Sequence, residues 1–140
     1  MSYLFAAAGG ALGALARWAV AAALPHPRGG WPWATLLVNL TGCLVIGALL
    51  AVLLARYAHS PWLRPFLAVG VLGGYTTYST FAVDVVQLTR AGHGLLAVAY
   101  LLASVVGGVL AVVIGLLAGR AAVRAVESVD DELRAGEGAT

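Results

Sequence analysis

The chain has 140 residues, of which 61% are hydrophobic and only 10% are charged, and its net charge is +2. Soluble domains carry about 25% charged residues, and a soluble chain of this size could not bury so much apolar surface in one core. With a mean hydropathy of +0.94, the composition excludes an ordinary soluble domain and indicates an integral membrane protein.

Four apolar runs follow one another along the chain, at about residues 3–24, 33–55, 65–89 and 94–118. At a rise of about 1.5 Å per residue, each is long enough to cross a hydrocarbon core of about 30 Å. We therefore expect an all-α membrane domain with four transmembrane helices over residues 1–119. Residues 120–140 are expected to form a polar C-terminal tail with no more than one or two helical turns.

Small residues recur at four-residue spacing within these runs, which predicts close helix packing. The pairs are Gly9 with Gly13, Gly70 with Gly74, and Gly115 with Gly119. In lipid, helices associate where small side chains let their backbones approach. These glycines therefore predict the packing seams of the bundle and need carry no chemistry.

The first two spans each contain one strongly polar residue, and polar groups are costly in hydrocarbon. Arg17 lies in the first span, where it either snorkels to the interface or attracts anions to a pore mouth. Asn39 interrupts the second span, where it either makes an interhelical hydrogen bond or donates to a permeating solute. The sequence leaves both alternatives open.

The third span is interrupted by Gly73-Gly74-Tyr75-Thr76-Thr77-Tyr78-Ser79-Thr80-Phe81, which has four Ser/Thr residues and three aromatics in nine positions. Glycine pairs and β-branched residues are poor helix formers. We therefore expect a broken helix, whose freed backbone groups must be satisfied by protein, ion or water. Hydroxyls, N–H groups and the positive edges of aromatic rings would suit a small anion.

Enzyme chemistry has little to use in this chain. The spans contain no pair of carboxylates, and the three histidines, His26, His59 and His93, lie one in each loop. This separation does not fit metal-ligand spacing. We expect neither an enzyme nor a partner that is a nucleic acid.

Three segments carry a resemblance to a known family: "GGALGALARW" (9–18), "ATLLVNLTGCLVIG" (34–47) and "GGYTTYSTF" (73–81). In order and spacing the chain resembles the Fluc/CrcB family of fluoride channels over residues 3–118. The resemblance implies an antiparallel, dual-topology dimer in the cell (plasma) membrane, with two fluoride pores and a structural Na⁺ at the dimer centre. It also implies passive export of fluoride from the cytoplasm, which reduces fluoride toxicity.

The family's functional positions map onto eight residues of this chain. The resemblance places the fluoride path at Arg17, Asn39, Tyr78, Ser79, Thr80 and Phe81, and the Na⁺ ligands at the backbone carbonyls of Gly73 and Thr76.

Three residues depart from the family pattern: Tyr78 replaces a phenylalanine, and Gly108 and Val112 stand where hydroxyl residues are common. They leave open a subunit with one altered or closed pore. The arginines are also unequally divided: the side that holds both termini has Arg56, Arg64, Arg120, Arg124 and Arg134, and the other has Arg28 and Arg90. Basic residues favour the cytoplasmic side. The second subunit is therefore either identical and inverted, or an oppositely oriented paralogue.

Two rival functions remain. A small dual-topology multidrug exporter would need an intramembrane glutamate in the first span, which has Arg17 and no acid. A membrane scaffold would explain the glycine seams but not Asn39 or the interruption at residues 73–81.

Overall fold

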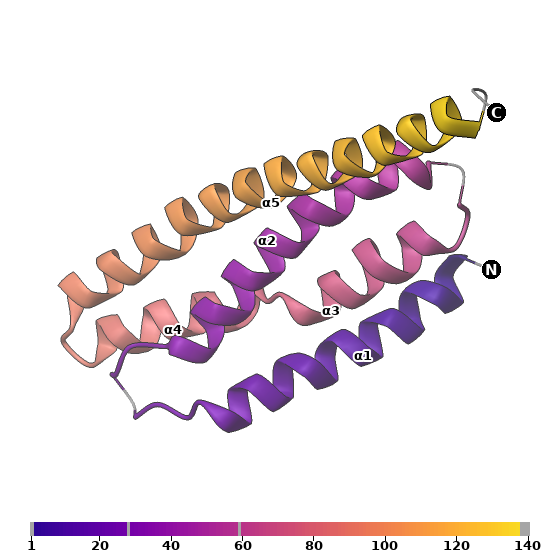
Figure 1. Cartoon of the computed structure of the whole chain (residues 1–140). Helices are drawn as coiled ribbons and strands as arrows, with labels where there is room; N and C mark the ends of the chain where they lie inside the picture. The colour runs from indigo at the N-terminus through magenta and orange to yellow at the C-terminus, as the bar shows by residue number, and fades with distance from the viewer. Residues whose placement is uncertain (1, 28, 59, 138–140) are drawn as a thin grey trace.

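The computed structural model describes residues 2–27, 29–58 and 60–137 as a bundle of helices joined by short loops (Figure 1). Its elements are α1 (Ser2–Ala23), α2 (Trp33–Arg56), the π-helical stretch η1 (Pro65–Leu72), α3 (Gly73–Tyr75), α4 (Tyr78–Arg90) and α5 (Gly94–Glu137). Four helical segments are long and apolar enough to cross a membrane: Ser2–Ala23, Trp33–Arg56, Pro65–Arg90 and Gly94–Val129. The described residues form no strand. The expectation of an all-helical chain with four segments of spanning length is confirmed.

The helices are arranged as two packed pairs that meet at the third span. Helix α1 lies along η1 and α3, whereas α2 and α4 lie along α5. The N-terminus, the C-terminus and the connection from α2 to η1 lie at one end of the bundle (Figure 1). Arg28 and His59, which the sequence assigns to loops, lie outside the described residues.

The glycine pairs mark the seams between these helices, as expected. A methyl group on Gly13 would collide with the carbonyl oxygen of Val71, and one on Gly74 would collide with the carbonyl of Gly10. A second seam joins α2 to α5, where Gly115 meets the carbonyl of Leu44. Backbone contact of this kind requires glycine, because any side chain would push the helices apart.

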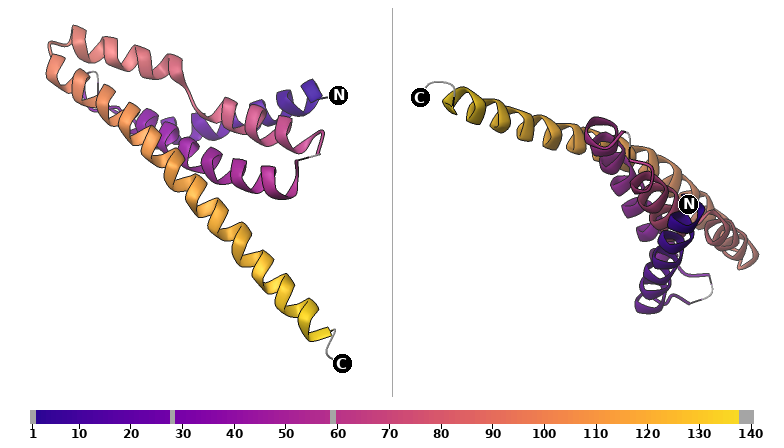
Figure 2. Two further views of the ribbon diagram at one scale, coloured as in Figure 1. Left: turned by 90° about the horizontal axis from the view of Figure 1, so that it is seen from above. Right: turned by 90° about the vertical axis from the view of Figure 1, so that its right-hand side faces the viewer.

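The tail differs from the expectation, because α5 continues as one helix of 44 residues to Glu137. Its last part projects beyond the other helices (Figure 2). Residues 120–135 contain neither glycine nor proline and are rich in the good helix formers Ala, Arg and Glu. Since the preceding span already supplies the helix nucleus, extension costs little. The prediction of one or two turns was therefore wrong.

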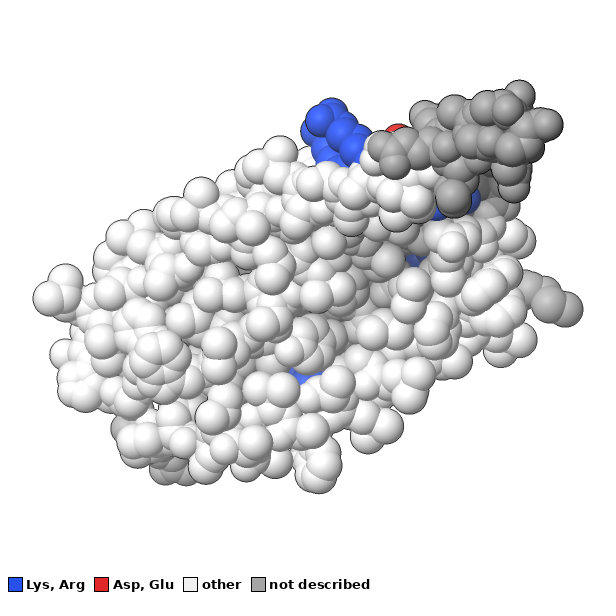
Figure 3. Space-filling model, viewed as in Figure 1, with Lys and Arg blue, Asp and Glu red and all other residues white. Residues whose placement is uncertain are grey.

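Much of the bundle surface is apolar, as a lipid-facing surface should be. Leu95, Val109 and Leu117 are among its many exposed hydrophobic residues. In the view of Figure 3 the charged side chains gather at the end where α5 projects, and the remaining surface is almost free of them. One cluster of buried residues consists of Leu36, Leu88, Ala97 and Tyr100.

Candidate functional site

The third span breaks near its middle, between the end of α3 at Tyr75 and the start of α4 at Tyr78. Thr76 has φ −74° and ψ 156°, and Thr77 has φ −146° and ψ 120°, so both are extended. Figure 1 shows this stretch as a short crossing between α3 and α4. A break here follows from the glycine pair before it and the two β-branched residues in it.

Asn39 of α2 holds the break through both atoms of its side-chain amide. Its Oδ1 accepts a hydrogen bond from the Thr77 N–H at 2.8 Å, and its Nδ2 donates to the Thr77 carbonyl at 3.0 Å. The amide therefore satisfies two backbone groups that the broken helix leaves without helical partners. Of the two alternatives left open by the sequence, the interhelical hydrogen bond is observed.

Thr77 also caps the start of α4. Its hydroxyl accepts a hydrogen bond from the Thr80 N–H at 3.2 Å and donates to the Thr80 hydroxyl at 3.0 Å. The Ser79 hydroxyl lies 3.4 Å from the Thr77 hydroxyl oxygen. The first N–H groups of a helix have no intrahelical acceptor and carry partial positive charge. The break therefore presents the positive end of α4.

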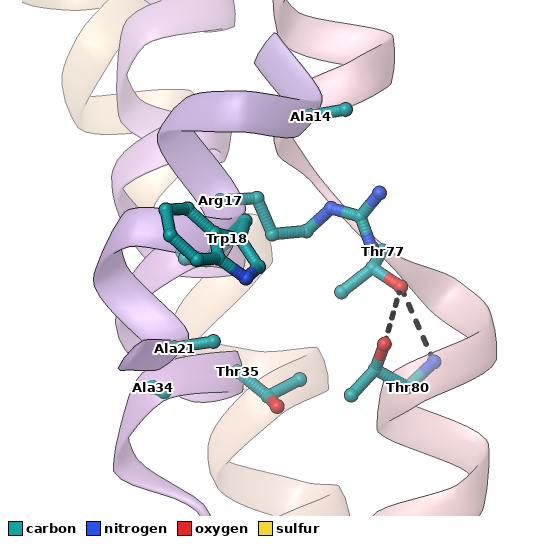
Figure 4. A pocket seen from close by; sticks show the side chains of 9 residues that line it. Ala14, Arg17, Trp18, Ala21, Ala34, Thr35, Thr77 and Thr80 are labelled. Atoms are coloured by element: carbon teal, nitrogen blue, oxygen red, sulfur yellow. Dashed lines mark hydrogen bonds between the residues drawn. The ribbon is translucent and has the colours of Figure 1, made fainter. Parts of the chain in front are cut away.

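Arg17 of α1 reaches the break from the other side. It is half-buried, and its Nε donates to the Gly74 carbonyl at 3.1 Å. Its side chain lines a cavity of about 320 Å³ together with Trp18, Thr35 and Thr80. Figure 4 shows the guanidinium extending toward Thr77. Arg17 therefore places a positive charge beside the break instead of snorkelling to the interface.

A second cavity, of about 310 Å³, lies on the other side of Thr77, which lines both. Its wall includes Asn39, Tyr78, Phe81 and Ser104. The Tyr78 and Phe81 rings lie 6.0 Å apart, and Tyr78 is 81% exposed. The Ser104 hydroxyl oxygen is buried and has no hydrogen-bond partner among the described residues. It is a buried polar group for which the described residues provide no partner.

The structure divides the backbone carbonyls of the break into two sets. Those of Gly74 and Thr77 accept hydrogen bonds from Arg17 and Asn39. Those of Gly73 and Thr76 accept no hydrogen bond from a side chain, loop or cap N–H of the described residues, although the N–H and hydroxyl of Thr76 both donate to the Leu72 carbonyl. The described part of the chain contains no cluster of three His, Cys, Asp or Glu side chains that could hold a metal ion. Main-chain carbonyl oxygens such as those of Gly73 and Thr76 are the kind of donor that could bind a small hard cation.

The residues singled out from the sequence occupy three positions around the break. Asn39, Tyr78 and Phe81 share one cavity, and Arg17 and Thr80 share the other. Ser79 is exposed and lines neither of them. Gly73 and Thr76 line a third cavity, of about 290 Å³, between α2 and η1.

Sequence reasoning gave no role to Tyr100 of α5, which is fully buried beside the site. Its hydroxyl donates to Asp84 Oδ2 at 3.3 Å, and its ring lies 5.5 Å from that of Phe81. The signal was its spacing: Tyr100 lies four residues before Ser104, and Asp84 lies three residues after Phe81. Each pair therefore shares one helix face.

Gly108 and Val112, which depart from the family pattern, both lie where α5 packs against α2. At Gly108, the Cys43 sulfur lies 3.6 Å from the place a Cβ would take. The Val112 carbonyl lies in the seam against Gly47. The polar side chains that α5 brings to the break are therefore those of Tyr100 and Ser104.

Comparison with known proteins matches residues 4–116 to the family described as CrcB-like protein, Camphor Resistance (CrcB). A "Fluoride-specific ion channel FluC" of Rhizobium meliloti is 43% identical over 121 residues, which cover 86% of this chain and 97% of that protein. A "Fluoride-specific ion channel FluC 2" of Nocardia farcinica is 42% identical over 112 residues, or 80% of each chain. A protein of the same name from Streptomyces avermitilis is 47% identical over 98 residues, which cover 70% of this chain and 62% of that protein.

Proposed function

This chain belongs to the CrcB-like family, and on that premise we propose that it is a fluoride-specific ion channel. It is a multi-pass protein of the cell membrane. In the proposal fluoride moves passively out of the cytoplasm, which lowers its toxicity. The observation that carries the proposal is the clamped break at Thr76 and Thr77, where Thr77 lines two cavities that also contain Arg17 and Thr80 in one and Asn39 and Ser104 in the other.

The chemistry around the break supports a small anion. Arg17 supplies positive charge on one side, and the rings of Tyr78 and Phe81 supply partly positive edges on the other. Ser104 lines the same cavity as these two rings, and its buried hydroxyl has no hydrogen-bond partner among the described residues. Asp84 is the only acidic residue before Glu127, and it is buried against Tyr100. We therefore propose that fluoride passes along Arg17, Thr80, Ser79, Tyr78, Phe81 and Asn39.

We further propose a structural Na⁺ held by the carbonyls of Gly73 and Thr76. Two carbonyls are too few for a dehydrated cation, and an inverted second copy would supply two more. Gly73 is exposed, and a methyl group added to it would meet no atom within 4 Å. This free backbone surface supports an antiparallel dimer with the cation at its centre. Na⁺ would join the two breaks and take no part in transport itself.

The test is fluoride efflux from liposomes that contain the purified protein and are loaded with fluoride, followed with a fluoride electrode. We expect rapid efflux of fluoride and little efflux of chloride from matched vesicles. The Thr89→Val variant is a suitable control, because that hydroxyl bonds only its own helix, at Val85. Fluoride efflux no faster than from protein-free vesicles, for both parent and control, would refute a channel formed by this chain alone.

A second candidate is a channel assembled from this chain and an oppositely oriented paralogue. Gly108 and Val112 bring no hydroxyl to the path, so both symmetry-related pores of a homodimer would lack these hydroxyls, whereas a paralogue could supply them. The end that holds both termini also holds the larger share of the arginines, which favours one orientation. Efflux that appears only when a second family member is co-expressed would favour this candidate.

A further inference from the structure

Arg17 is the only basic residue within the four apolar runs of the sequence. The only acidic residue within these runs is Asp84, and its carboxylate accepts a hydrogen bond from the Tyr100 hydroxyl. Its one hydrogen bond among the described residues runs from Nε to the Gly74 carbonyl. An arginine at this depth is costly. Its hydrogen bond to a main-chain oxygen therefore indicates that Arg17 has a role at the break.

The packing of α1 fixes this contact. Gly13 lies four residues before Arg17, on the same helix face, and faces the carbonyl of Val71 and the N–H of Tyr75. Gly74 packs against the backbone of Gly10. Because the backbones of α1 and the third span touch at both glycines, the Gly74 carbonyl lies within reach of Arg17 Nε. The same contacts leave α1 little room to shift along the third span.

The Gly73-Gly74 pair needs such a constraint. Glycine has the widest choice of backbone conformations, and the adjoining Thr76 and Thr77 lie outside any helix. A donor that fixes the Gly74 carbonyl limits rotation of the peptide units on either side. It also removes that oxygen from the set that can bind a cation, which leaves Gly73 and Thr76.

We infer that Arg17 is a positioning residue for the cation site: its Nε–H holds the Gly74 carbonyl and thereby presents the carbonyls of Gly73 and Thr76 to Na⁺. The inference rests on the proposed function, in which those two carbonyls bind the ion. It assigns Arg17 a role that depends on hydrogen-bond geometry, whereas attraction of anions depends on charge alone.

Lysine separates the two roles, because it keeps the charge and lacks the planar guanidinium fork. The two accounts predict opposite results for Na⁺. If Arg17 acts by charge alone, Arg17→Lys binds Na⁺ as the parent does. Arg17→Gln then binds it more tightly, because a repelling cation has been removed. If Arg17 positions the carbonyl, Arg17→Lys weakens Na⁺ binding although the charge is unchanged.

The experiment measures the thermal unfolding midpoint of the full-length protein in detergent as NaCl replaces N-methyl-D-glucamine chloride at constant ionic strength. We expect Arg17→Lys to raise the half-saturating Na⁺ concentration about tenfold, as loss of one charge-assisted hydrogen bond would. The matched control is Arg120→Lys, at an exposed arginine of the α5 extension, which should respond like the parent.

A parental Na⁺ response in Arg17→Lys, or tighter binding in Arg17→Gln, would overturn the positioning role and leave the proposed channel intact. A parent protein whose midpoint ignores Na⁺ would instead remove the cation from the proposed function, and the inference with it. Fluoride efflux from liposomes reports separately on the channel in each case.

Discussion

Replacing Asn39 by leucine tests whether the break depends on its clamp. Leucine is branched at Cγ as asparagine is but leaves the N–H and carbonyl of Thr77 without the partners they have at 2.8 and 3.0 Å. Interhelical hydrogen bonds in membrane proteins average about 0.6 kcal/mol and reach about 1.7 kcal/mol. A stranded buried backbone group costs about 1–3 kcal/mol. Because two groups are stranded in a half-buried position, we expect the free energy of unfolding to fall by about 2–4 kcal/mol.

Asn39→Asp separates the clamp from the path. A carboxylate still accepts from the Thr77 N–H, but its second oxygen faces the Thr77 carbonyl where Nδ2 now donates. One hydrogen bond is lost, so we expect a loss of about 1–2 kcal/mol, and the protein should still fold. The negative charge beside Tyr78 and Phe81 should repel fluoride and stop efflux.

Both variants can be measured by SDS titration of the protein in mixed micelles, with efflux from liposomes in parallel. Thr89→Val is the control, because its hydroxyl bonds only the Val85 carbonyl of its own helix, and its change should stay within about 0.5 kcal/mol. If Asn39→Leu unfolds at the same SDS fraction as this control, the clamp contributes no stability. Its loss of efflux would then mean that Asn39 acts only on the permeating ion.

Three other results are expected. Phe81→Ile should fold normally but slow fluoride efflux, since it removes a ring edge from the cavity. Efflux at the rate of the parent protein would mean that the fluoride path does not run past Phe81. Gly13→Ala should lower the free energy of unfolding by about 1–3 kcal/mol, because its methyl collides with Val71, whereas Gly10→Ala meets no atom within 4 Å and should not. Labelling of single cysteines at both termini distinguishes the two assemblies: equal labelling from both sides is expected for an antiparallel homodimer, and termini found only in the cytoplasm would favour the pair with a paralogue.

The spans and the break could be predicted because they depend on local properties of the chain. Four apolar runs of sufficient length define four helices wherever the solvent is lipid. The stretch from Gly73 to Thr77 is weak in helix propensity, and the helix ends at Tyr75. The path of α5 beyond Gly119 was mispredicted because charge was used to infer water exposure, which says nothing about helix formation.

The partners of the polar residues could not be predicted, because they depend on how the helices pack. An asparagine in a span must find partners, but only the register of α2 against the third span makes Thr77 that partner. Arg17 reaches Gly74 because four glycines bring α1 against η1 and α3. Tyr100 was passed over because a tyrosine near the end of a span usually lies at the membrane interface, whereas here it is fully buried.

The polar residues and the break stabilise one another, which explains why they occur together. An arginine at the centre of a span costs about 2.5–3.5 kcal/mol, and a broken helix strands its own backbone groups. Arg17 from one packed pair of helices and Asn39 from the other satisfy two carbonyls and one N–H of the break. A continuous third helix would satisfy its own backbone and leave both side chains without partners. The break is therefore an integral part of the fold, since α1 and α2 each carry a side chain that hydrogen-bonds its backbone groups.

Three polar groups near the break are not satisfied in this way. The carbonyls of Gly73 and Thr76 and the hydroxyl of Ser104 find no donor or partner among the described residues. Unsatisfied groups at membrane depth persist only beside water, ions or another protein, and these are therefore the groups to which the proposed second subunit and permeating ion would have to bind. Main-chain carbonyls suit a cation, and a hydroxyl beside aromatic edges suits an anion, so the proposed cation binding and the proposed anion passage would fall to different groups around one break.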